Sequence, residues 1–92
     1  MPRFLIEIPH ESTGDACIKA IDVILRTGAH FFTHADWGCK DGEHKAWLIV
    51  DVNSKDEALG IVPVSFRKAA KIVQLNAFSK EEIRDALSQH AS

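Results

Sequence analysis

The run His30-Phe31-Phe32-Thr33-His34-Ala35-Asp36-Trp37-Gly38-Cys39 concentrates the side chains of this chain that could do chemistry. If the run is a strand, the alternation of side chains places His30, Phe32, His34 and Asp36 on one face. Two imidazoles and a carboxylate are the donor types of transition-metal sites and of acid–base catalysts. We therefore take this face as the candidate functional site.

A divalent transition metal, nickel or zinc, is the first interpretation of this face. His34 and Asp36 are the leading ligands, because residues two apart on a strand lie about 6–7 Å from each other. His30 lies about 13 Å from His34 on a straight strand, so one ion reaches both only if the strand bends or a second chain contributes. His10, near the end of the first predicted strand, is a further candidate ligand.

An acid–base site is the second interpretation of the same residues. His34 would act as the general base and Asp36 would orient it, in a cofactor-free isomerase- or monooxygenase-like enzyme for a small organic molecule. Glu7, Phe32 and Trp47 would line the cavity. The sequence has no Gly-rich phosphate loop and no Rossmann fingerprint, so no nucleotide cofactor is expected. A third interpretation, a structural dimer without catalysis, stays open, and the sequence does not decide whether the protein is an enzyme.

The two cysteines, Cys17 and Cys39, are read as separate residues. They form neither a Cys-x-x-Cys motif nor a disulfide framework, which indicates a reducing cytoplasm. Cys39 and His44 lie across a predicted hairpin turn, where a histidine can make a thiol reactive or metal-binding. A turn cysteine beside a solvated histidine is the commoner arrangement. Cys17 is expected to be a small core residue on the apolar face of a helix.

Length and charge restrict the class of protein. The chain has 92 residues, and we expect one domain over 1–92. Its formal net charge is −2 and it contains no block of like charges, so nucleic acid is not an expected partner. Its apolar stretches are shorter than a membrane span, and residues 1–7 are typical of a strand rather than a signal peptide. We expect a cytoplasmic protein without a membrane partner.

Periodicity predicts an α+β fold with strands at 3–9, 29–39, 43–52 and 70–76. A helix of about fourteen residues ends near Gly28, and capping boxes at Ser54 and Ser79 begin a short helix and a C-terminal helix. The order βαββαβ plus a terminal helix is the ferredoxin-like split β-α-β pattern, with a four-stranded antiparallel sheet. The turn at residues 41–42 places Trp37 opposite Ala46.

One face of this sheet combines Leu5, Phe32, Trp47 and Ile49 with ionisable groups. Exposed on a monomer, these side chains would form an unusually large apolar patch. We therefore expect a homodimer in which the open faces of two sheets stack and enclose a cavity that could hold a small-molecule ligand. The alternative is that the C-terminal helix covers this face within one chain.

The opening Met1-Pro2-Arg3-Phe4-Leu5-Ile6-Glu7, together with the predicted order of elements, resembles the dimeric α+β barrel superfamily. More narrowly, it resembles the short bacterial proteins of that superfamily that begin Met-Pro-Arg-Phe/Tyr-Leu, one branch of which is nickel-binding. The resemblance implies a ferredoxin-like homodimer and a protein that binds nickel. Superfamily members include isomerases, monooxygenases and metal binders, so fold analogy does not fix the function, and no site residue is carried over.

Overall fold

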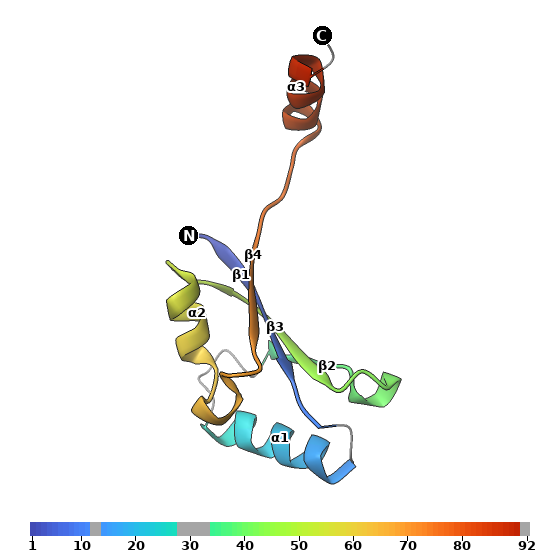
Figure 1. The fold of residues 1–92 in the computed structure, drawn as a ribbon, viewed down its shortest axis with the longest axis vertical. Helices are drawn as coiled ribbons and strands as arrows, with labels where there is room; N and C mark the ends of the chain where they lie inside the picture. The colour runs from blue at the N-terminus through green and yellow to red at the C-terminus, as the bar shows by residue number, and fades with distance from the viewer. Residues whose placement is uncertain (12–13, 28–33, 91–92) are drawn as a thin grey trace.

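The structure, a computed structural model, describes residues 1–11, 14–27 and 34–90. Its elements are drawn in Figure 1. In chain order they are β1 (Arg3–Pro9), α1 (Gly14–Thr27), β2 (Asp36–Trp37), the 3₁₀ turn η2 (Cys39–Asp41), β3 (Lys45–Asp51), α2 (Lys55–Ile61), the 3₁₀ turn η3 (Val64–Phe66), β4 (Lys71–Leu75) and α3 (Lys80–His90).

The four strands form one antiparallel sheet in the order β2-β3-β1-β4. This confirms the prediction of an α+β fold with a four-stranded antiparallel sheet. Trp37 pairs with Ala46, as the predicted register requires. The predicted strand 29–39 is shorter than expected in its described part, because only Asp36 and Trp37 are in β2. His30 and Phe32 lie outside the described residues.

The hydrophobic core lies on one face of the sheet, under α1 and α2. Alternation along each strand turns every second side chain to this face. Each helix contributes apolar side chains from one stripe, Ile24 from α1 and Ala58 from α2. The strand residues of the core are Phe4, Ile6 and Ile8 of β1 and Ala46, Leu48 and Val50 of β3.

The opposite face of the sheet carries the side chains that the predicted register assigned to it. Leu5 pairs with Ile49 and Glu7 pairs with Trp47, so all four point away from α1 and α2. The Trp47 indole Nε1 donates a hydrogen bond of 3.2 Å to Glu7 Oε1. Ile49 is 57% exposed, so the described helices leave this open face uncovered.

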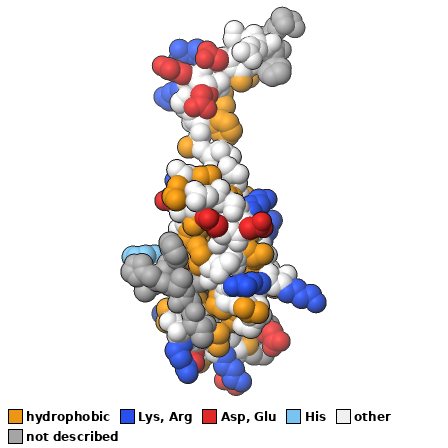
Figure 2. Space-filling view, turned by 90° about the vertical axis from the view of Figure 1, so that its left-hand side faces the viewer, with side chains coloured by type: hydrophobic (Ala, Val, Ile, Leu, Met, Phe, Trp, Pro, Cys, Tyr) orange, Lys and Arg blue, Asp and Glu red, His pale blue; other side chains and the backbone are white. Residues whose placement is uncertain are grey.

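Helix α3 lies at the end of an extended segment, clear of the sheet (Figures 1 and 2). The Ser79 hydroxyl accepts a hydrogen bond of 3.0 Å from the Glu82 amide, which is the predicted N-cap. The apolar side of this helix does not pack inward, as an amphipathic helix would be expected to do, since Ile83 is 45% and Leu87 is 65% exposed. Residues 76–79 continue the direction of β4, so they carry the helix past the end of the sheet.

Candidate metal and thiol site

Four residues that can bind a metal meet at one end of the sheet: His10, Cys17, Cys39 and His44. One ligand atom from each lies within 4.8 Å of the other three. The residues come from four places in the chain. His10 follows β1, Cys17 lies near the start of α1, Cys39 opens η2, and His44 precedes β3.

The two histidines are brought together by the pairing of β1 with β3. The last pair of this ladder is Pro9 with Lys45, and the His10 amide continues it by donating a hydrogen bond of 3.0 Å to the His44 carbonyl. Alternation gives His10 the face of Ile8, the side covered by α1. The two imidazole rings meet edge to face, with centroids 5.7 Å apart.

Cys17 and Cys39 reach the cluster from two different elements, α1 and the β2–β3 hairpin. Cys17 is only 8% exposed, because it lies on the buried stripe of α1 with Ala20 and Ile24. Cys39 is positioned by the hairpin between β2 and β3, in which Gly38 donates to the Lys45 carbonyl at 3.0 Å. Cys39 opens η2 two residues after Trp37, whose partner Ala46 is in the core.

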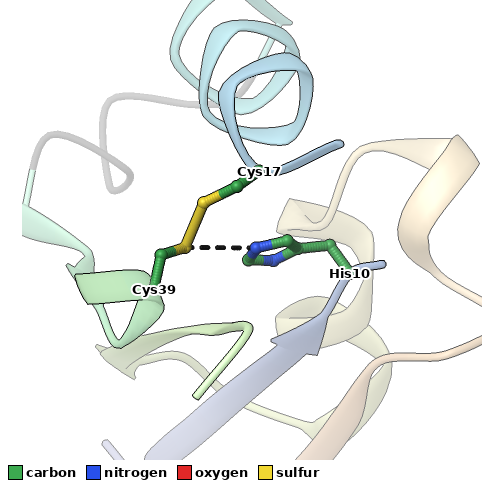
Figure 3. Close-up of a disulfide and its surroundings, with 3 residues drawn as sticks. All are labelled: His10, Cys17 and Cys39. Carbon is green, nitrogen blue, oxygen red and sulfur yellow. Dashed lines mark hydrogen bonds between the residues drawn. A yellow bond between two sulfur atoms is a disulfide. The ribbon is translucent and has the colours of Figure 1, made fainter. Parts of the chain in front are cut away.

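In the structure Cys17 and Cys39 form a disulfide, and the His10 imidazole points at it (Figure 3). Their Cα atoms are 6.9 Å apart, and His10 Nε2 lies 3.2 Å from Cys39 Sγ. The interpretation of the cysteines as separate residues is therefore wrong. Twenty-two positions separate them in the sequence, and only the packing of α1 against the hairpin brings them together.

The disulfide also removes the basis for inferring a reducing compartment from cysteine usage, because that inference required unpaired cysteines. None of the helices in the described ranges is long and apolar enough to cross a membrane.

The surroundings of the His10 imidazole favour a metal ligand over a charged side chain. Burial, and secondarily the neighbouring His44, lowers the pKa of His10, so its ring is neutral near pH 7. A neutral imidazole is the form that binds metals. The Nδ1 atoms of His10 and His44 are both buried, and neither has a hydrogen-bond partner within the described ranges. Leaving a buried polar atom without a partner costs about 1–3 kcal/mol. Each Nδ1 atom would therefore gain stability from binding a partner.

In the dithiol form this cluster supplies two thiolates and two imidazoles. That is the ligand set of tetrahedral structural zinc sites, in which Zn–S is about 2.3 Å and Zn–N about 2.0–2.1 Å. Two sulfurs bound to one such ion lie about 3.8 Å apart. The four ligand atoms of the cluster lie within 4.8 Å of one another, which is close to the spacing of ligand atoms around such an ion.

The residues predicted from the sequence occupy another part of the molecule. His34 and Asp36 line a shallow hollow of about 190 Å³ on the open face, together with Leu5 and Trp47. Glu7 lies near this hollow, where it accepts the hydrogen bond from Trp47. Within the described ranges, neither His34 nor Asp36 belongs to a group of three or more potential metal ligands.

Of the predicted ligands, the structure places only His10 in the cluster, while His30 lies outside the described residues. Sequence reasoning considered the Cys39–His44 pair but did not join it to His10 and Cys17. The signal was present in the alternation of β1 and β3 and in the apolar stripe of α1, which direct His10, His44 and Cys17 to one side of the sheet.

A larger hollow of about 620 Å³ borders the cluster. It lies between α1 and η3 and is mainly apolar, with Ala20, Val23 and Phe66 in its wall. His10 is one of its lining residues, and the same ring lies 3.2 Å from Cys39 Sγ.

Comparison with known proteins provides no relative from which function could be transferred. No protein-family model matches the chain, and no curated protein or solved structure matches it significantly. The function must therefore be argued from the site itself.

Proposed function

We propose that the reduced protein binds one divalent transition metal, zinc or nickel, through His10, Cys17, Cys39 and His44. The observation that carries this proposal is the convergence of four ligand atoms within 4.8 Å, from four separate parts of the chain. The ligand set differs from the histidine and carboxylate set that the sequence suggested. Two thiolates make it softer, and this favours zinc among the divalent ions.

A four-ligand site supports binding more than metal catalysis. Catalytic zinc sites have three protein ligands and leave a position for water or substrate, whereas four protein ligands close the coordination shell. The ion would also connect β1, α1 and the hairpin, whereas the disulfide of the present structure joins α1 to the hairpin. We therefore propose a metal that is carried or that stabilises the fold.

Metal uptake by the reduced, untagged full chain tests this proposal. We expect about one zinc or nickel per chain by elemental analysis after removal of unbound metal. His10→Ala and His44→Ala should each lower the affinity at least about tenfold, because each removes a ligand. His34→Ala and Asp36→Ala are matched controls from the open face and should bind as the unmodified chain does. The proposal would be contradicted if His10→Ala and His44→Ala retained the metal while His34→Ala and Asp36→Ala lost it.

Acid–base catalysis remains a second candidate function, because His34 and Asp36 line one hollow with the indole of Trp47. This arrangement places an imidazole and a carboxylate beside an apolar wall, as a site for a small organic acid would require. Turnover by this site would be independent of added metal and lost in His34→Ala. Turnover retained in that variant would exclude His34 as the base.

We propose also that the chain is a homodimer through its open sheet face, with the ferredoxin-like split β-α-β topology. The alternative was that the C-terminal helix covers this face, and α3 instead stands clear of it. Ile49, 57% exposed, together with Leu5 and Trp47, supports a second copy as the cover.

A further inference from the structure

The two sulfurs that would bind the metal are the same two that form the disulfide. A thiolate is a strong metal ligand, whereas a disulfide sulfur carries no charge and binds metals poorly. Each cysteine can therefore be in one state at a time, bound to the ion or bonded to the other cysteine. Oxidation of the pair removes half of the ligand set and leaves the two imidazoles alone.

The two cysteines differ in their exposure and in their neighbours. Cys17 is 8% exposed and packs on the inner stripe of α1, so small reagents reach it poorly. Cys39 is half-buried in the hairpin turn, and His10 Nε2 lies 3.2 Å from its sulfur. The geometry makes Cys39 the first site of attack.

We infer that the site is a redox-controlled metal switch in which Cys39 reacts first with a hydroperoxide, Cys17 resolves the product, and the metal is released. This inference rests on the proposed metal binding and adds its regulation. The packing of α1 against the hairpin allows the disulfide product, because the structure holds both sulfurs in bonding contact with the Cα atoms 6.9 Å apart.

The chemistry balances with hydrogen peroxide as the oxidant. The Cys39 thiolate attacks one peroxide oxygen, the O–O bond breaks, and a sulfenic acid forms while the departing hydroxide takes a proton and becomes water. The Cys17 thiolate then attacks the Cys39 sulfur, the S–S bond forms, and the S–O bond breaks to release a second hydroxide, which is also protonated. Two thiolates, one peroxide and two protons give one disulfide and two waters, and the dication is set free.

The test uses the reduced, zinc-loaded full chain and one equivalent of hydrogen peroxide in the absence of oxygen. Released zinc is measured with a chromogenic chelator, and thiols are counted in the same sample. We expect one zinc released for every two thiols lost, a Cys17–Cys39 disulfide by peptide mapping, and return of zinc binding after treatment with a dithiol. Zinc that stays bound while peroxide is consumed would overturn the inference.

The order of attack is tested with single variants. In Cys17→Ser, peroxide should produce a sulfenic acid on Cys39 that a dimedone probe traps, while Cys39→Ser should show little trapping on Cys17. A second measurement does not depend on how the variants fold. In the reduced, metal-free unmodified chain, iodoacetamide should alkylate Cys39 several-fold faster than Cys17. Equal rates, or faster alkylation of Cys17, would contradict the assigned order.

Failure of this inference and failure of the proposed function give different results. A reduced chain that takes up no zinc before peroxide is added overturns the metal site and with it the switch. A chain that takes up zinc and then keeps it after Cys17 and Cys39 have been oxidised overturns the switch alone.

Discussion

At the scale of single residues, His10 links the thiol and imidazole halves of the site. Its Nε2 lies 3.2 Å from Cys39 Sγ, and its ring meets His44 edge to face. Trp37 lies on another side, with ring centroids 6.1 Å apart. Because the ring is packed from several directions, its orientation toward the sulfur is fixed by the fold. The His10→Ala variant therefore removes both a ligand and the side chain that contacts the Cys39 sulfur.

Gly38 is the residue whose substitution should disturb the site without removing a ligand. A Cβ atom at this position would lie 2.7 Å from the Glu43 carbonyl oxygen and 2.7 Å from the Trp47 ring. The hairpin that carries Cys39 and His44 would therefore have to shift. We expect Gly38→Ala to lower the free energy of unfolding by about 1–3 kcal/mol and to weaken metal binding, measured by urea denaturation and zinc titration.

Gly60→Ala is the matched control for this substitution. A Cβ atom at Gly60 meets nothing within 4 Å, and the residue lies within helix α2, where alanine is favoured over glycine by about 0.5–1 kcal/mol. We expect this variant to be as stable as the unmodified chain or slightly more so. Equal stability of the two alanine variants would show that the hairpin accommodates the added methyl group.

At the scale of secondary-structure elements, the disulfide holds α1 against the β2–β3 hairpin. It spans 22 positions, and closing a loop of this length in the unfolded chain is worth about 3 kcal/mol in the chain-entropy model. We expect reduction of the metal-free protein to lower the free energy of unfolding by about that amount, measured by urea denaturation. Zinc added to the reduced protein should restore stability, because it binds the folded state.

The double variant Cys17→Ser/Cys39→Ser is the control for both effects. It should be less stable than the oxidised protein and should respond neither to a reductant nor to zinc. If the urea midpoint of the unmodified chain does not change on reduction, the disulfide between α1 and the hairpin contributes nothing to stability.

At the scale of the whole molecule, the open sheet face should join two chains. We expect the full chain to sediment as a dimer at micromolar concentration, and Ile49→Glu to shift it toward the monomer by placing a charge in the contact. Leu25→Glu is the control, because Leu25 is 56% exposed and belongs to α1, on the opposite side of the sheet. A monomeric unmodified chain, or a dimer unaffected by Ile49→Glu, would contradict this expectation.

The elements and the register were accessible from sequence because they follow from local signals. Alternation fixed the two faces of β1 and β3, and the Ser54 and Ser79 caps marked the starts of two helices, since each hydroxyl accepts a backbone hydrogen bond. The packing of α3 was not accessible, because an apolar stripe containing Ile83 and Leu87 does not specify which surface it meets.

The metal and thiol cluster was not predicted, because its four residues are far apart in the sequence, whereas sequence patterns reveal residues that are close together. His34 and Asp36 are two positions apart, whereas Cys17 and Cys39 are brought together only by the packing of a helix on a hairpin. The sheet alternation already placed His10 and His44 on the helix-covered side. What sequence alone could not provide is the rotation of the hairpin turn that brings Cys39 to the start of α1.

X-ray absorption at the zinc edge of the reduced, zinc-loaded chain tests the central claim most directly. If the ion is bound by Cys17, Cys39, His10 and His44, it should have two sulfur neighbours at about 2.3 Å and two nitrogen neighbours at about 2.0–2.1 Å. Loss of the sulfur shell after peroxide treatment would follow from the switch. A first shell of only nitrogen and oxygen in the reduced protein would contradict the account and would return the metal to residues such as His34 and Asp36 on the open face.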